Sequence, residues 1–239
     1  MDEELFPPGE PPPARAPERR AREARASRGL SSRLVLRASD FPSGAPGGPG
    51  VCGLDEAGRG PLAGPVSAGA VVLPEGFPLD ALDDSKALSA ARREAAYALI
   101  ADRALAWCVA WAYPCEIDEL NILGASLLAM RRAYEGLAAV LARLGEPAPS
   151  AVYVDGNRLP DLGRPCAAVV KGDSIVPAIM AASIMAKVAR DRAMERYDWL
   201  YPDYGYARHK GYPTAAHREA CRRLGPSPIQ RMSFDYGKP

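Results

Sequence analysis

The sequence has few histidines and no closely paired cysteines, and both shortages limit the chemistry open to it. Its 239 residues include 2 histidines and 5 cysteines, and no two cysteines have the CxxC spacing. Structural zinc sites are built mainly from cysteine and histidine, so the sequence does not predict one. An odd number of free thiols is typical of a protein in a reducing compartment. We therefore expect a cytoplasmic protein whose metal ligands, if it binds a metal, are carboxylates.

Long apolar runs are also missing. No stretch approaches the roughly 20 apolar residues that a membrane-spanning helix needs. The N-terminal residues MDEE are followed by no apolar segment, so no secretory signal is predicted. The contents of 48% apolar and 25% charged residues are typical of globular proteins. These features predict a globular protein, which we expect to be a monomer without a membrane partner.

The formal net charge of +1 is small, but the charges are unevenly distributed. Residues 51–157 carry 8 basic and 14 acidic side chains, whereas residues 158–239 carry 14 basic and 8 acidic ones. An acidic centre beside a basic final third suits a metal site flanked by a surface that binds a polyanion. Biased codon usage is an alternative source of the basic residues, because 25 of the 30 are arginine.

Composition and periodicity divide the chain into an arm and one domain. Residues 1–50 hold nine of the 24 prolines and no periodic apolar pattern, so we expect most of this arm to be disordered. The remaining residues, 51–239, are predicted to form a mixed α/β domain with helices covering the sheet. Apolar patterns predict a strand that begins at residue 51 and further strands at 65–73, 105–113, 151–155 and 167–173. They also predict helices at 89–103, 176–198 and 214–224, and a long helix that ends at residue 144. An aromatic-rich loop is predicted at 197–212 and a loosely held tail after the last helix.

Acidic residues follow three of the predicted strands. Asp55 and Glu56 come first, and Asp155 and Asp173 each follow a later apolar run. Strands that end at one edge of an α/β sheet bring such side chains to a common crevice. Crowded carboxylates repel one another unless a cation neutralises them, and Mg²⁺ or Mn²⁺ prefers such oxygen ligands. Adjacent side chains in a regular strand point to opposite faces, however, so spacing alone leaves open whether all four acids share one site.

Seven segments, taken in order, closely resemble bacterial ribonuclease HII. They are DEAGRGPLAGPV, DDSKALS, EIDELNILGASLLAM, VDGN, VVKGDS, AASIMAKVARDR and YGYARHKGYPTAAH. The resemblance runs from Val51 to about Phe234 and leaves out only the N-terminal arm and the last residues. It implies a ribonuclease H-like fold, a mixed sheet flanked by helices with a helical C-terminal part.

The resemblance also implies an activity and a set of site residues. The implied enzyme is a metal-dependent endonuclease that cuts the RNA strand of RNA–DNA hybrids and single ribonucleotides in duplex DNA, using Mn²⁺ or Mg²⁺, with two ions during catalysis. It leaves 5′-phosphate and 3′-hydroxyl ends. The implied catalytic and metal-binding residues are Asp55, Glu56, Asp155 and Asp173, and the implied substrate-binding residues are Gly58, Arg59, Gly60, Lys86, Ser183, Lys187 and Tyr212.

The implied roles of the substrate-binding residues differ. The segment Gly58–Gly60 reads the ribose 2′-hydroxyl through its backbone, and Tyr212 stacks on the deoxyribose that follows the ribonucleotide. Lys86, Ser183 and Lys187 contact phosphates and brace the site, although a helix cap or a surface position would also explain these three. Tyr212 would alternatively be a core residue.

Two departures and two rival functions stand beside this resemblance. The final motif reads RMSF, where the family often has two basic residues before Ser-Phe, so a C-terminal phosphate contact is expected to be absent. The arm is too short and proline-rich for the folded N-terminal domain of the sister family, ribonuclease HIII. The first rival function is a nuclease that acts on DNA junctions, but such an enzyme would not need a reader of the 2′-hydroxyl. The second is a non-catalytic module that binds hybrids, but such a module would not need all four acids.

Overall fold

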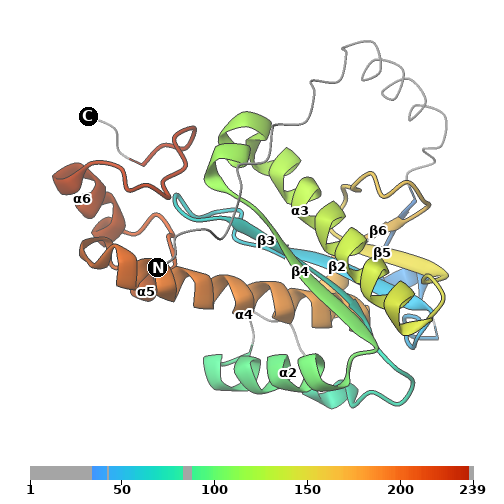
Figure 1. The fold of residues 1–239 in the computed structure, drawn as a ribbon. Coiled ribbons are helices and arrows are strands. Elements are labelled where there is room, and N and C mark those ends of the chain that lie inside the picture. The colour runs from blue at the N-terminus through green and yellow to red at the C-terminus, as the bar shows by residue number, and fades with distance from the viewer. Residues whose placement is uncertain (1–33, 42, 83–87, 237–239) are drawn as a thin grey trace, which may run out of the picture. The chain divides into compact units, whose positions relative to one another are not determined.

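The computed structural model describes residues 34–41, 43–82 and 88–236, all of which belong to one compact unit. Their central element is a six-stranded sheet with the order β1-β6-β5-β2-β3-β4 (Figure 1). The strands are Val35–Leu36 (β1), Val51–Ala57 (β2), Val66–Val72 (β3), Ala106–Ala112 (β4), Ala151–Asp155 (β5) and Ala167–Val169 (β6). Strands β1, β6, β5 and β2 pair in parallel, and β3 and β4 are antiparallel to their neighbours. The predicted mixed α/β fold is confirmed.

Helices cover both faces of this sheet. Helix α3 (Pro114–Leu144) lies on one face, and α4 (Pro177–Leu200) lies on the other, with α2 (Ala90–Arg103) packed against α4 (Figure 1). Ser89 caps α2 as predicted, because its side chain accepts a hydrogen bond from the Arg92 N–H. Covering on both faces explains why every residue of β3 is buried.

The small residues of α4 let it approach the sheet at backbone distance. A Cβ atom added to Gly53 would lie 2.1 Å from the carbonyl carbon of Ala178, and one added to Gly69 would lie 2.3 Å from the Ala182 carbonyl oxygen. Side chains at these two strand positions would therefore push the helix away. The predicted close packing of the alanine-rich face of α4 is confirmed, and it fixes α4 close to the central strands.

Helix α3 has two parts. Asn121 has a φ of 59° and interrupts the helical dihedral angles, and its side chain accepts hydrogen bonds from the N–H groups of Leu123 and Gly124. The longer part after Asn121 carries the predicted apolar stripe, of which Met130, Tyr134, Leu137 and Leu141 are buried. Leu144, predicted to belong to the stripe, is 59% exposed because it lies in the last turn before Gly145.

The C-terminal part differs from the prediction in two respects. Helix α4 continues to Leu200, and two short helices, Pro202–Tyr204 (η5) and Tyr206–His209 (α5), occupy much of the predicted loop before α6 (Ala215–Leu224). The segment after α6 is not loosely held. Ile229, Gln230, Arg231 and Tyr236 are buried, because this segment packs against the loop that follows β2.

Part of the arm also differs from the prediction. Residues 35–36 form β1, and the Phe41 ring packs edge-on against Tyr153 at a centroid distance of 6.0 Å. The folded unit therefore begins before residue 51.

Residues 1–33 and the predicted site residue Lys86 lie outside the described residues. Within the described part, no helix is both long enough and apolar enough to cross a membrane.

Candidate active site

The parallel pairing of β2 with β5 brings two of the predicted acids, Asp55 and Asp155, together. Leu54 pairs with Val154, so the next residues on the two strands, Asp55 and Asp155, are neighbours at the same edge of the sheet. Both strands lie in the middle of the sheet, and Asp55 is only 4% exposed. The backbone N–H of Glu56 donates a 2.7 Å hydrogen bond to the Asp55 carboxylate and holds it in place.

Asp173 reaches the site by a turn and not at the end of a strand. Strand β6 ends at Val169, earlier than predicted, and Lys171 then adopts a left-handed φ of 58° before the short helix Gly172–Ser174 (η4). This turn directs the backbone N–H of Asp173 to the Asp155 carboxylate at 3.2 Å. Gly172 permits the approach, because a Cβ atom there would lie 2.6 Å from an Ile179 side-chain carbon.

Three of the four predicted acids form one cluster. Single carboxylate oxygens of Asp55, Asp155 and Asp173 all lie within 4.8 Å of one another. They are hard oxygen donors at the spacing that one divalent cation can bridge, so the residues present fit Mg²⁺ or Mn²⁺.

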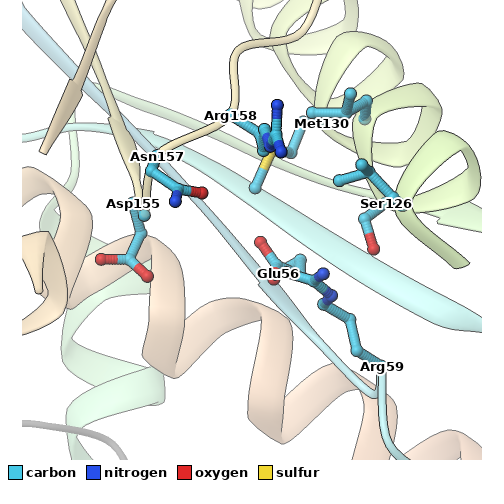
Figure 2. Close-up of a pocket in the computed structure, with 10 residues that line it drawn as sticks. Glu56, Arg59, Ser126, Met130, Asp155, Asn157 and Arg158 are labelled. Atoms are coloured by element: carbon cyan, nitrogen blue, oxygen red, sulfur yellow. Dashed lines mark hydrogen bonds and ion pairs between the residues drawn. The ribbon is translucent and has the colours of Figure 1, made fainter. Parts of the chain in front are cut away.

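Glu56 lies beside this cluster without belonging to it. Its carboxylate is bound by the Arg59 guanidinium at 3.1 Å, and it lines a pocket of about 60 Å³ together with Asp155 and residues of α3 (Figure 2). Strand β2 continues to Ala57, so the alternation of side chains is kept and Glu56 points away from Asp55. The structure thus brings three acids together and places the fourth at the edge, within the same pocket as Asp155.

Burial and repulsion between neighbours raise the pKa values of Asp55, Glu56 and Asp155. Burial raises the pKa of Asp55 well above its usual range, and the neighbouring Glu56 and Asp155 raise it further. Burial also raises the pKa of Glu56, against the opposing effect of Arg59. The pKa of Asp155 is raised first by burial and then by Asp173. Proteins tend to keep such crowded, perturbed carboxylates at functional sites, where a bound cation relieves the repulsion.

The glycine-rich loop after β2 is in contact with the loop that carries Tyr212. Gly58 has a φ of 97°, which favours glycine. A Cβ atom on Gly60 would lie 3.5 Å from the Tyr212 ring, and the Leu62 N–H donates a 2.8 Å hydrogen bond to the Gly211 carbonyl. Tyr212 is 43% exposed, so it is not a core residue. Arg59 is half exposed on the same surface.

Two further predicted residues lie on α4, one turn apart. Ser183 is buried, and a hydrogen bond from its side chain to Asp55 lowers the pKa of that carboxyl group against the effect of burial. Lys187 forms a 2.8 Å ion pair with Asp191. Ser183 therefore braces an acid of the cluster, and Lys187 is held by an acid on its own helix.

Sequence reasoning missed several residues of this region. Asn157 and Arg158 line the pocket beside Asp155, and their position directly after the VDG segment was a signal. Arg190 and Arg231 are buried beneath the glycine-rich loop, and no local pattern indicates this.

Comparisons with known proteins agree with this geometry. A model of the ribonuclease HII family matches residues 52–236. A curated ribonuclease HII from Laribacter hongkongensis (strain HLHK9) is 59% identical over 186 residues, which are 77% of this chain and 90% of that protein. Among solved structures, a chain in the PCNA:RNase HII complex from Archaeoglobus fulgidus has a TM-score of 0.61 at 28% identity, covering 77% of this chain and 94% of that chain.

A third relative shares the fold alone. Bst-RNase HIII, solved in complex with Mn²⁺, has a TM-score of 0.63 at 18% identity, covering 80% of this chain and 68% of that chain. The family match and the 59% identity confirm the resemblance seen in the motifs. The chain belongs to the ribonuclease HII family.

Proposed function

We propose that this ribonuclease H endonuclease cuts RNA–DNA hybrids and also cuts at single ribonucleotides embedded in duplex DNA. One observation carries the proposal: the acidic cluster lies at the end of β2, and the glycine-rich loop that contacts Tyr212 begins a few residues later on the same chain. A site for hydrolysis and a compact reader of one sugar are thus next to each other. A reader of this size needs one ribonucleotide and no run of them.

The acids are proposed to act as metal ligands. Asp55, Asp155 and Asp173 would hold a divalent cation, and Glu56 would complete the site for a second one after release from Arg59. Bound Mg²⁺ or Mn²⁺ would supply charge stabilisation at the phosphate and a more acidic attacking water, leaving 5′-phosphate and 3′-hydroxyl ends. The protein itself orients the ligands: Ser183 and the Glu56 N–H hold Asp55, and the Asp173 N–H holds Asp155.

The substrate is proposed to lie across the glycine-rich loop. The backbone of Gly58, Arg59 and Gly60 would read the 2′-hydroxyl, which distinguishes RNA from DNA. The exposed ring of Tyr212 would pack against the next deoxyribose. Lys187 and the basic final third would bind phosphates, as would Lys86, which lies outside the described residues. Five free cysteines support a reducing, cytoplasmic compartment, and we expect a monomer.

An end-labelled duplex with one ribonucleotide tests this function. The protein is incubated with this duplex, with the matching all-DNA duplex and with a long hybrid, each with Mg²⁺, with Mn²⁺ and with EDTA. We expect cleavage at the ribonucleotide and within the hybrid that depends on the metal and is absent from the all-DNA duplex. Cleavage of branched all-DNA substrates instead would support the junction nuclease, and tight binding without cleavage would support the binding module.

A further inference from the structure

Two fully buried arginines lie beneath the glycine-rich loop. Arg190, on α4, is 1% exposed, and Arg231, in the segment after α6, is 0% exposed. Burial lowers the pKa of Arg190 to about 10. Burial, together with the charge of Arg190, lowers the pKa of Arg231 to about 9. Both side chains are therefore cationic at neutral pH, and a buried charge persists only where its donors are satisfied.

Arg231 donates to four carbonyl groups of the loop. Its Nη2 lies 2.6 Å from the Gly58 oxygen, and its Nη1 lies 3.0 Å from the Arg59 oxygen and 2.7 Å from the Pro61 oxygen. Its Nε lies 2.9 Å from the Gly64 oxygen. One planar guanidinium thus fixes the carbonyl direction at four positions within seven residues.

Arg190 ties this loop to the loop of Tyr212. It donates to the Pro65 oxygen at 3.0 Å and to the Ala63 oxygen at 3.2 Å, and also to the Lys210 oxygen at 3.0 Å. It also packs against Gly58, where an added Cβ atom would lie 2.0 Å from its Nε. Arg190 therefore joins the two loops in addition to the backbone hydrogen bond between the Leu62 N–H and the Gly211 carbonyl.

The direction of the carbonyl groups decides the direction of the amide groups. In a planar trans peptide the C=O and N–H bonds point in opposite directions. The Gly58 and Arg59 carbonyls point inward to Arg231, so the N–H groups of Arg59 and Gly60 point outward. Arg59 and Gly60 are exposed, and a Cβ atom on Gly60 would lie in contact with the Tyr212 ring.

We propose that Arg231 and Arg190 are positioning residues for ribonucleotide recognition. They set the outward direction of the Arg59 and Gly60 amides and the distance of these amides from Tyr212, so that one 2′-hydroxyl and the following sugar are read together. The inference rests on the proposed function, in which this loop reads the ribose. Both arginines act through the loop and do not contact the substrate themselves.

Asp118 extends this arrangement to the surface. Its carboxylate accepts hydrogen bonds from the N–H groups of Met232 and Ser233 at 2.9 and 2.8 Å, and from the Ser233 hydroxyl at 2.6 Å. It thereby holds the turn that follows Arg231. Through Arg231, the RMSF segment thus contributes a buried brace to the glycine-rich loop.

The test measures preference for a ribonucleotide separately from folding and from catalysis. Arg231→Lys, Arg231→Met and Arg190→Lys are each combined with Asp155→Asn, which is expected to prevent cleavage. The dissociation constant is measured for a duplex with one ribonucleotide and for the same duplex without it, and the ratio gives the preference. The same arginine variants are also made without the Asp155→Asn substitution, and their kcat and KM are measured on the single-ribonucleotide duplex.

We expect the preference ratio to fall in the order arginine, lysine, methionine at position 231, because lysine keeps donors and methionine keeps none. Misplacement of the reading groups by about 1 Å is expected to lower kcat/KM on the single-ribonucleotide duplex by about 100-fold. Affinity for the all-DNA duplex is expected to stay within about twofold, since phosphate contacts dominate it. Partial retention by lysine is a result that a purely structural role would not give.

Arg164→Lys is the matched control. Arg164 also donates hydrogen bonds, to the Pro149 carbonyl and the Tyr134 hydroxyl, but it does so away from the glycine-rich loop. The preference ratio of Arg164→Lys is therefore expected to equal that of the unmodified protein. If Arg231→Met does not fold, Asp118→Ala replaces it, because it loosens the same turn from the surface.

The outcomes separate the two proposals. A parent protein without any preference for the ribonucleotide overturns the proposed function. The positioning role alone is overturned if the parent protein shows the preference and the Arg231→Lys, Arg190→Lys and Asp118→Ala variants keep the same preference ratio within about twofold.

Discussion

Replacing Asp155 by asparagine is expected to inactivate the enzyme and yet to stabilise the metal-free protein. The change removes one negative charge from the cluster of Asp55, Asp155 and Asp173 and keeps the shape of the side chain. An asparagine oxygen still accepts the hydrogen bond that the Asp173 N–H donates to position 155. The loss of charge is therefore the main effect of the substitution.

The size of the effect follows from the geometry. Two unit charges separated by 4.8 Å, the span of the cluster, repel each other by roughly 3 kcal/mol at an effective dielectric constant of 20. Hydrogen bonds from the Glu56 N–H to Asp55 and from the Asp173 N–H to Asp155 offset part of this repulsion. We therefore expect a gain of about 1–2 kcal/mol in the free energy of unfolding, which corresponds to a rise in Tm of about 2–8 °C.

The pH dependence has a definite sign. A carboxyl group whose pKa is raised by folding binds protons more tightly in the folded state than in the unfolded state. The stability of the metal-free protein therefore falls as the pH rises from the usual carboxyl pKa through the raised one. The slope is expected to be shallower in Asp155→Asn, since one of the titrating groups is gone.

The assay is thermal unfolding in EDTA and in millimolar Mn²⁺, with Asp102→Asn as the control because the Asp102 side chain is 80% exposed. In EDTA the Asp155 variant is expected to unfold at a higher temperature than the parent, and the Asp102 variant at the same one. Mn²⁺ is expected to stabilise the parent more than the Asp155 variant, because the variant lacks a ligand. Cleavage is expected to be lost with hybrid binding retained. A lower Tm in EDTA, or equal stabilisation by Mn²⁺, would refute the reasoning.

Three other outcomes are expected. Tyr212→Ala, which loses a ring worth about 1–3 kcal/mol in stacking, should impair cleavage at a single ribonucleotide more than cleavage of a long hybrid, and equal losses would make Tyr212 merely structural. Gly58→Ala should reduce kcat/KM and stability together, because its φ of 97° and the nearby Arg190 side chain exclude a Cβ atom; an unchanged Tm measured by calorimetry would contradict this. Deleting residues 1–33 should leave the Tm unchanged, whereas deleting 1–48 should lower it by removing β1 and Phe41, and two identical melting curves would argue against a role for β1.

The sequence by itself determined most elements of the fold and the candidate acids of the site. Apolar runs predicted the central strands, and Ser89 and Gly145 marked a helix start and a helix end where the structure has them. These features are local, since a cap or a strand depends on neighbours a few residues away. The motifs likewise indicated the family, which the comparisons confirm.

Tertiary structure decided what depends on distant partners. The alternation of side chains along a strand left open whether Asp55 and Glu56 share one site. The pairing of β2 with β5 places Asp55 beside Asp155, and the ion pair with Arg59 holds Glu56 outside the cluster. The segment after α6 resembles a loose tail by composition. Arg231 nevertheless binds carbonyl groups some 170 residues earlier in the chain, and this burial is favourable only once α4 and both loops surround its guanidinium with acceptors.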